Sequence, residues 1–379
     1  MRRIALTVGS ALLATSLAPA AHASTGAFTA ASTAAPGTVV SVSPLPAPLW
    51  LPGTGSAHRV TYVSTDSSGK RALSSGAMFT PKGKAPRGGW PVVSWTHGTV
   101  GIGDSCAPST AGRSERDITY LTTWMARGYA IVSSDYIGLG TPGVHPYLDG
   151  RTAAHSAADM VRAARHVDKS LARKWVAIGQ SQGGHAALFT AATAPKYAPD
   201  LDFRGAVATG PPSNLESIVS LAGPYIPNIP LPDLTAYTAY ILAGLRAARP
   251  GLNLDRYLTP LGKQVVKDAE NLCYDPMVKR TEGIGIGQLL NRSLFDATFF
   301  TNLRGIMEVP LTGYTRPFYI GQGMVDTTVP IPLTLKLVAA LKARSVNFTF
   351  KAYPGADHSG TMAASLPDTT KFVAALFAH

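Results

Sequence analysis

The chain has 379 residues, of which 45% are hydrophobic and only 15% are charged, and its formal net charge is +12. This composition excludes an intrinsically disordered chain, which needs low hydrophobicity together with high net charge. The length allows two domains, or one domain with a sizeable insertion. The positive charge favours contact with anionic surfaces such as lipid headgroups or cell-wall polymers. Because the basic residues are dispersed and no nucleic-acid motif is present, we expect no nucleic-acid partner. We also expect a monomeric protein.

The N-terminus has the three parts of a secretory signal peptide. A cationic start, Met1-Arg2-Arg3, is followed by an apolar stretch over residues 4–17, and Ala21-His22-Ala23 has the small-x-small form of a cleavage site. The apolar core is too short to span a bilayer. We therefore predict a signal peptide over residues 1–23, cleaved near Ala23, and a secreted, extracellular mature protein.

Residues 24–50 are rich in Ala, Ser, Thr and Pro, which predicts a mobile leader. Beyond it, apolar runs alternate with segments of helical periodicity. We predict strands over residues 60–64, 77–80, 90–95, 129–135, 175–179, 205–209, 317–322 and 347–352. We predict helices over residues 113–127, 152–171, 182–194, 332–344 and 368–378. This alternation favours an α/β fold in which a mostly parallel sheet carries helices on both faces.

The alternation of strands and helices stops between about residues 213 and 312. Pro-rich turns introduce two apolar helical segments there, over residues 234–248 and 259–269. We predict that residues 213–312 form a helical cap, inserted between two parts of the sheet domain over residues 51–212 and 313–379.

Two cysteines, Cys106 and Cys273, make up the whole cysteine content of the chain. An even count in an oxidising compartment favours a disulfide, which we predict for this pair; two buried free thiols are the alternative. No His/Cys cluster adjoins either cysteine, so we expect no metal site.

The motif Gly179-Gln180-Ser181-Gln182-Gly183 fits G-x-S-x-G, a pattern that alone often arises by chance. Here a predicted strand leads into the motif and a predicted helix leads out of it. A nucleophile elbow needs small residues two positions before and after the serine, because the strained turn brings neighbouring backbones close. We therefore predict that Ser181 is a nucleophile; a glycine-rich turn without chemistry is the alternative.

A serine hydroxyl is a weak nucleophile without a base, and after such an elbow an acid and then a histidine follow in the chain. Asp326 comes just after the predicted strand 317–322, and His358 just after the predicted strand 347–352. Both lie on loops at the carboxyl ends of parallel strands, where open α/β sheets place their ligands. We predict that His358 accepts the proton of Ser181 and that Asp326 orients the imidazole.

Other acids and histidines suit structural roles better. Asp357 adjoins His358, so the two side chains point apart, and Asp135 precedes the serine in the chain. His185 lies four residues after the serine, and we expect it to face the sheet or a neighbouring strand. The remaining histidines have no better case as the base: His97, His145, His155 and His166.

Acyl transfer also needs backbone N–H donors that face the tetrahedral oxygen. We expect one donor from Gln182, the residue after the nucleophile. We expect the other from Thr99, because His97-Gly98-Thr99 follows a predicted strand and resembles the H-G-x element of esterases. After a small shift in register the donor would be one of its neighbours, Gly98, Val100 or Gly101.

These residues together resemble the secretory lipase family of α/β-hydrolases, the yeast lipase-A type with actinobacterial relatives. The resemblance rests on WTHGT at 95–99, DSCAPS at 104–109, DYIGLGTPG at 135–143, HPYL at 145–148, GQSQGG at 179–184 and GADH at 355–358. It implies an α/β-hydrolase fold, an ester-hydrolysing enzyme with a cap between core strands six and seven, and a triad of Ser181, Asp326 and His358. The cap is short and Pro-rich, and it has no residue-by-residue match to the lipase lid.

The expected function is that of a secreted lipase or esterase which cleaves acylglycerols or other acyl esters through an acyl-enzyme, without metal or organic cofactor. Ile241, Leu242 and Leu245 share one helical face of the cap, which suits an acyl chain, although ordinary packing explains them equally well. The alternatives are a secreted serine peptidase or amidase with the same triad, and a catalytically silent hydrolase fold that binds a partner.

Overall fold

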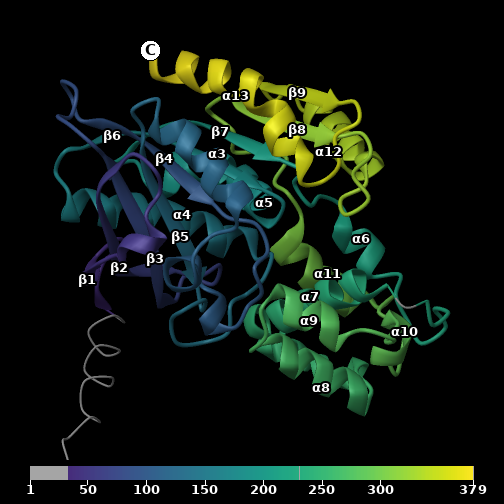
Figure 1. Ribbon diagram of the computed structural model, residues 1–379. Helices are drawn as coiled ribbons and strands as arrows, with labels where there is room; N and C mark the ends of the chain where they lie inside the picture. The colour runs from purple at the N-terminus through teal and green to yellow at the C-terminus, as the bar shows by residue number, and fades with distance from the viewer. Residues whose placement is uncertain (1–32, 230, 379) are drawn as a thin grey trace, which may run out of the picture.

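The computed structural model describes residues 33–229 and 231–378. The predicted signal peptide and its cleavage site near Ala23 lie outside the described residues. The central feature is a nine-stranded sheet with the order β1-β2-β3-β5-β4-β6-β7-β8-β9, flanked by helices (Figure 1). The predicted α/β fold, with a mostly parallel sheet between two helical layers, is confirmed.

The sheet begins with three antiparallel strands, β1 (Val39–Pro44), β2 (Thr54–Thr65) and β3 (Arg71–Pro81). Residues 39–44 belong to the segment 24–50 expected as a mobile leader, and for them that expectation is wrong. Val42 pairs with Val60 of β2, and the run Val-Val-Ser-Val-Ser alternates β-branched residues in a way that favours a strand. One turn of 3-10 helix, η1 (Ala47–Leu49), connects β1 to β2.

The other six strands are parallel to one another, and β5, the first of them in the sheet, pairs antiparallel with β3. Parallel strands of this kind are covered on both faces and therefore consist of nearly continuous buried residues. Every residue of β5 is buried. The six strands are β4 (Trp90–Thr96), β5 (Ala130–Ile137), β6 (Leu171–Gln180), β7 (Asp202–Thr209), β8 (Phe318–Gly323) and β9 (Phe348–Tyr353).

Successive residues of a strand contact different helical layers, as the two-residue repeat of a strand requires. On β4, Val92 packs into one core and Val93 into the other. The layer on the side of Val92 contains α4 (Gly150–Val167), α5 (Gln182–Tyr197) and α12 (Ile331–Ala343). The layer on the side of Val93 contains α3 (Glu115–Met125) and α13 (Gly360–Ala378). Two short elements precede α3, namely η2 (Asp104–Cys106) and α2 (Pro108–Ala111).

Two helices have other bounds than the sequence suggests. The helix expected over residues 152–171 ends at Val167, because residues 168–170 form a turn and β6 begins at Leu171. The last helix begins at Gly360 rather than at residue 368, and Pro367 lies inside it. Proline removes one backbone donor from a helix interior, yet the helix continues through this position.

The helices between β7 and β8 pack around one hydrophobic core, which also includes Ile102, Tyr147 and Leu148 of the sheet domain. We call residues 213–312 the cap. Its core is formed by buried residues such as Tyr240, Leu242, Val265 and Leu303. The elements of the cap are α6 (Leu215–Val219), α7 (Pro232–Ala248), η3 (Pro250–Leu252), η4 (Leu254–Tyr257), α8 (Pro260–Ala269), α9 (Tyr274–Arg280), α10 (Ile286–Leu289) and α11 (Ala297–Met307). They form a separate lobe below the sheet in Figure 1.

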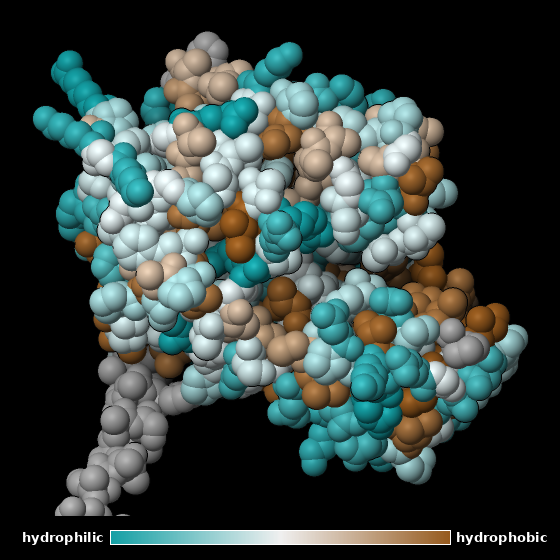
Figure 2. Space-filling model, in the orientation of Figure 1, coloured by the Kyte–Doolittle hydropathy of each residue, from teal (hydrophilic) through white to brown (hydrophobic). Residues whose placement is uncertain are grey.

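The cap also carries exposed apolar side chains. Figure 2 shows hydrophobic surface gathered along the side of the molecule where the cap meets the sheet domain. Large exposed apolar residues of the cap are Ile218, Leu221, Tyr225, Ile229, Leu231, Leu234, Leu261 and Phe295. Within residues 33–229 and 231–378, no helix is long and apolar enough to cross a membrane.

Candidate active site

Ser181 lies on a strained turn between β6 and α5. Its φ of 58° and ψ of −126° lie outside the regions that non-glycine residues readily adopt, and such strain costs about 1–3 kcal/mol. A Cβ atom on Gly179 or Gly183 would overlap backbone or side-chain atoms of the turn and of Thr96, so both positions need glycine. The N–H of Ser181 donates to the carbonyl of Thr209 on the adjacent strand β7 (2.9 Å). These contacts hold the serine hydroxyl at the carboxyl end of the sheet, as a nucleophile elbow does.

Asp326 and His358, which come from the loops after β8 and β9, are hydrogen-bonded to each other. His358 Nδ1 lies 2.7 Å from Asp326 Oδ2, and the side chain of Asp326 is fully buried. With Nδ1–H donating to the carboxylate, the neutral imidazole has its lone pair on Nε2. This tautomer is the one that a general base requires.

Three further donors fix the Asp326 carboxylate. The N–H groups of Thr328 and Val329 donate to Oδ1 (2.9 and 2.8 Å), and Gln322 Nε2 donates to Oδ2 (2.9 Å). Thr334 Oγ1 in turn donates to Gln322 Oε1 (2.9 Å). The sequence did not indicate Gln322, because its role depends on a contact across the loop rather than on any motif.

Ser181 and His358 line one pocket of about 470 Å³. His358 Nε2 is buried and, among the described residues, has no hydrogen-bond partner. The hydrogen bond between His358 and Asp326 is thus present, whereas Ser181 and His358 are not hydrogen-bonded to each other. Catalytic hydrogen bonds are often long in unliganded enzymes and tighten when substrate binds.

The loop after β4 forms another wall of this pocket. Gly98 approaches the serine closely, since a Cβ atom at this position would lie 3.7 Å from Ser181 Cβ and 3.1 Å from Gln180 Oε1. Thr99 also lines the pocket, and its hydroxyl is hydrogen-bonded to Tyr147 OH (2.6 Å). The structure brings Thr99 beside the serine, and its role as an oxyanion donor stays a prediction.

Gln182, the other expected donor, begins α5 and is held by a buried histidine. Burial lowers the pKa of His145 to about 4, so its ring is neutral at pH 7. His145 Nδ1 donates to the carbonyl of Ile137 (3.0 Å), which leaves Nε2 to accept from Gln182 Nε2 (2.9 Å). The hydrogen bond between His145 and Gln182 therefore anchors the first turn of α5, directly after Ser181. The sequence did not indicate this function of His145.

The residues set aside as acids or bases have structural partners. Asp135 accepts hydrogen bonds from the N–H of Ser109 (2.9 Å) and from its hydroxyl, and Asp357 accepts from the N–H of Gly360 at the start of α13. His185 Nε2 donates to the carbonyl of Met307 in the cap (2.7 Å). The partner of His185 is thus a cap helix, where we expected the sheet or a neighbouring strand.

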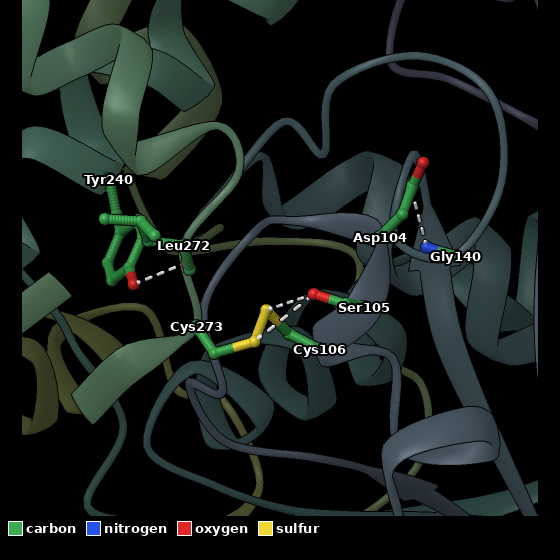
Figure 3. Close-up of a disulfide and its surroundings, with 7 residues drawn as sticks. All are labelled: Asp104, Ser105, Cys106, Gly140, Tyr240, Leu272 and Cys273. Carbon is green, nitrogen blue, oxygen red and sulfur yellow. Dashed lines mark hydrogen bonds between the residues drawn. A yellow bond between two sulfur atoms is a disulfide. The ribbon is translucent and has the colours of Figure 1, made fainter. Parts of the chain in front are cut away.

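The disulfide between Cys106 and Cys273 is present, with a Cα–Cα distance of 5.4 Å. Figure 3 shows that it joins η2 of the sheet domain to the cap segment that carries Leu272. Beside it, Gly101 forms a β-bridge with Cys273, and the N–H of Tyr274 donates to the carbonyl of Val100 (3.0 Å). The bridge therefore ties the cap to the loop that holds Thr99.

Two interpretations were open for Ile241, Leu242 and Leu245, namely an acyl-chain site and ordinary packing, and the structure supports packing. All three are buried in the core of the cap, with at most 4% of their surface exposed, and none lines the pocket. An apolar helix face packs against other helices just as well as against a ligand, so the sequence pattern alone does not decide between the two. The cap instead contributes Tyr237 and Tyr274 to the pocket. No cluster of His, Cys, Asp or Glu side chains suited to a metal ion occurs among the residues that the structure describes.

The chain and its structure are similar to known lipases and esterases. A family model described as secretory lipase matches residues 108–379. A protein of Mycobacterium tuberculosis (strain CDC 1551 / Oshkosh) that is named a probable inactive lipase is 23% identical over 346 residues, which cover 86% of this chain and 75% of the relative.

Two solved structures share the fold at low identity. Candida antarctica lipase A in its closed state superimposes with a TM-score of 0.70 at 20% identity, covering 90% of this chain and 82% of that one. The rice cell wall degrading esterase LipA of Xanthomonas oryzae, in a ligand-bound form, gives 0.69 at 19% identity, covering 90% and 97%.

Proposed function

The chain belongs to the secretory lipase family, and from that premise we propose that it is a secreted, catalytically active serine hydrolase of carboxylic esters. Ser181 is its nucleophile, His358 its general base and acid, and Asp326 the residue that orients the histidine. The observation that carries the proposal is the 2.7 Å hydrogen bond between His358 Nδ1 and Asp326 Oδ2, beside a serine held on a nucleophile elbow. The disulfide supports export, because such bonds persist in oxidising compartments.

In the proposed mechanism, Ser181 Oγ attacks the ester carbonyl while His358 Nε2 takes its proton. The tetrahedral oxygen is stabilised by the backbone N–H of Gln182 and by a second N–H from the loop at Thr99. His358 then returns the proton to the leaving alcohol, and an acyl-enzyme remains. Water, deprotonated by the same nitrogen, hydrolyses the acyl-enzyme and releases the acid. The carboxylate of Asp326 stabilises the imidazolium that forms on His358.

A catalytically silent protein of the same fold is the second candidate. Two observations favour it: the Mycobacterium relative is named a probable inactive lipase, and the hydrogen bond from Ser181 to His358 is not closed in the described structure. Against it, the buried carboxylate of Asp326 keeps four hydrogen bonds that serve no evident purpose unless the imidazole works.

An assay on the purified mature protein separates the candidates. We expect turnover of p-nitrophenyl acetate and butyrate, none of an aminoacyl anilide, and a loss of about 10⁶ in kcat for Ser181→Ala, which leaves no signal above the blank. Ester turnover that survives in Ser181→Ala refutes the mechanism. Anilide turnover above ester turnover favours a peptidase, and inactivity of both proteins favours the silent fold.

A further inference from the structure

An apolar groove lies next to the catalytic pocket, between α3 and α13 on the sheet domain. It has a volume of about 380 Å³, and Tyr120, Met362, Ala363 and Leu366 form its apolar walls. Tyr120 and Met362 are buried, and Ala363 is exposed. The catalytic pocket itself has only two aliphatic side chains in its lining, Val100 and Pro108.

The groove adjoins the catalytic pocket. Arg116 and Ser359 line both, and Arg116 NH1 donates to Ser359 Oγ (3.3 Å) at the boundary. The rest of the Arg116 guanidinium pairs with Asp117, through Nε (3.0 Å) and NH2 (2.9 Å), and Asp117 lines the catalytic pocket but not the groove. A chain that leaves the catalytic pocket past Ser359 therefore enters the groove beside the hydrogen bond between Arg116 and Ser359.

The position of His358 decides which part of an ester takes this path. His358 Nε2 protonates the leaving oxygen, so the alcohol part of the substrate lies on the histidine side of the scissile bond. Ser359, the entrance to the groove, is the next residue in the chain. The catalytic pocket is also lined by Thr99, Tyr237 and Tyr274, which do not line the groove. This part of the lining is left for the acyl part of the substrate, and its hydroxyl-bearing side chains do not favour a long alkyl chain.

We propose that the groove between α3 and α13 binds the alkyl chain of the alcohol part of the substrate. The substrate class is then esters of short or polar acids with longer apolar alcohols. This inference rests on the proposed function, because it takes Ser181 and His358 as the reacting pair. It assigns a specificity role to the surface of Ala363 and Leu366, which have no part in the chemistry.

The expected effect follows from methylene burial. Complete burial of one methylene contributes about 0.8 kcal/mol, a factor of about four in kcat/KM. An open groove covers about half of the chain surface, so we expect about two-fold per methylene. From ethyl acetate to hexyl acetate, kcat/KM is therefore expected to rise on the order of ten-fold, while ethyl acetate and ethyl hexanoate differ little.

The test fills the groove with Ala363→Trp and uses Ala364→Trp as the matched control. Both alanines are exposed on α13, but only Ala363 lines the groove. Turnover of the three esters is followed by pH-stat, and binding of 1-octanol to each protein by saturation-transfer NMR. Thermal melting verifies that both variants fold.

We expect Ala363→Trp to abolish the ten-fold rise and the 1-octanol signal, and Ala364→Trp to keep both. Ethyl acetate turnover stays unchanged in Ala364→Trp, and in each variant it is the reference against which the rise toward hexyl acetate is measured. The inference is overturned if Ala363→Trp keeps the rise, or if it lowers turnover of ethyl hexanoate instead of hexyl acetate. If neither wild type nor variants hydrolyse any ester, the proposed function fails. In that case the NMR measurement still tests the groove, because equal 1-octanol binding by the two variants would overturn the inference that it binds an alkyl chain.

Discussion

Removal of the disulfide tests how the cap is fixed to the sheet domain. The bridge closes a loop between residues 167 positions apart. In the chain-entropy model, a loop of this length restricts the unfolded chain by about 17 cal/mol/K, or about 5 kcal/mol at 25 °C. Domains are stable by roughly 5–15 kcal/mol in total, so this single bond accounts for a large share. For roughly 350 ordered residues, 5 kcal/mol corresponds to a fall in Tm of about 7 °C.

The assay compares Tm by calorimetry for wild type, for Cys106→Ser/Cys273→Ser, and for wild type in reductant. We expect the last two to agree and to melt about 7 °C below oxidised wild type. Ser105→Ala is the matched control, because Ser105 Oγ lies near both sulfur atoms (4.0 and 3.7 Å) and its loss leaves the bridge intact. Equal Tm values in oxidised and reduced protein, or free thiols in the oxidised protein by mass spectrometry, would refute the reasoning.

Three further substitutions probe the site and its surroundings. Asp326→Asn should lower kcat on p-nitrophenyl acetate by roughly 10⁴, because an amide does not hold the Nδ1–H tautomer; a loss below ten-fold contradicts this role. Burial lowers the pKa of His185 from 6.5 to about 4, so the unfolded chain binds more protons between these values and stability falls as pH drops from about 6.5 toward 4. His185→Gln keeps a donor for the Met307 carbonyl but removes the titrating ring. In urea unfolding, the slope of the unfolding free energy against pH should therefore decrease by up to about 1.4 kcal/mol per pH unit, whereas an unchanged slope contradicts a neutral buried ring. Gly183→Ala places a Cβ against the Thr96 backbone and should lower the free energy of unfolding in urea by at least about 2 kcal/mol. Gly251 has open space around it, so the control Gly251→Ala should lower it by less than about 0.5 kcal/mol. Equal losses in the two variants contradict the close packing of the elbow.

Features that depend on neighbours in the chain were predictable from the sequence. The elbow around Ser181 needs a strand, small residues and a helix within a few positions, and the loops of Asp326 and His358 follow directly from predicted strands. The pairing of Cys106 with Cys273 needed only an even count and an oxidising compartment. These signals lie within a few neighbouring residues or, for the disulfide, in the number of cysteines, so no knowledge of tertiary contacts was required.

Features that depend on tertiary contacts were not predictable. The strand over residues 39–44 lies in a stretch rich in small residues, and only pairing with β2 makes it a strand. The apolar face of Ile241 and Leu245 fits a helix core and a ligand pocket equally, and its packing partners decided between them. His145 and Gln322 gain their functions from single hydrogen bonds to residues on other segments.

The central claim is that His358 and Asp326 activate the hydroxyl of Ser181. A fluorophosphonate probe tests this directly, since an activated serine displaces fluoride and forms a stable bond to phosphorus, which intact-mass spectrometry counts. We predict one adduct per chain at Ser181, none in Ser181→Ala, and much slower labelling in Asp326→Asn. An unlabelled wild-type protein, or an adduct that persists in Ser181→Ala, contradicts the claim.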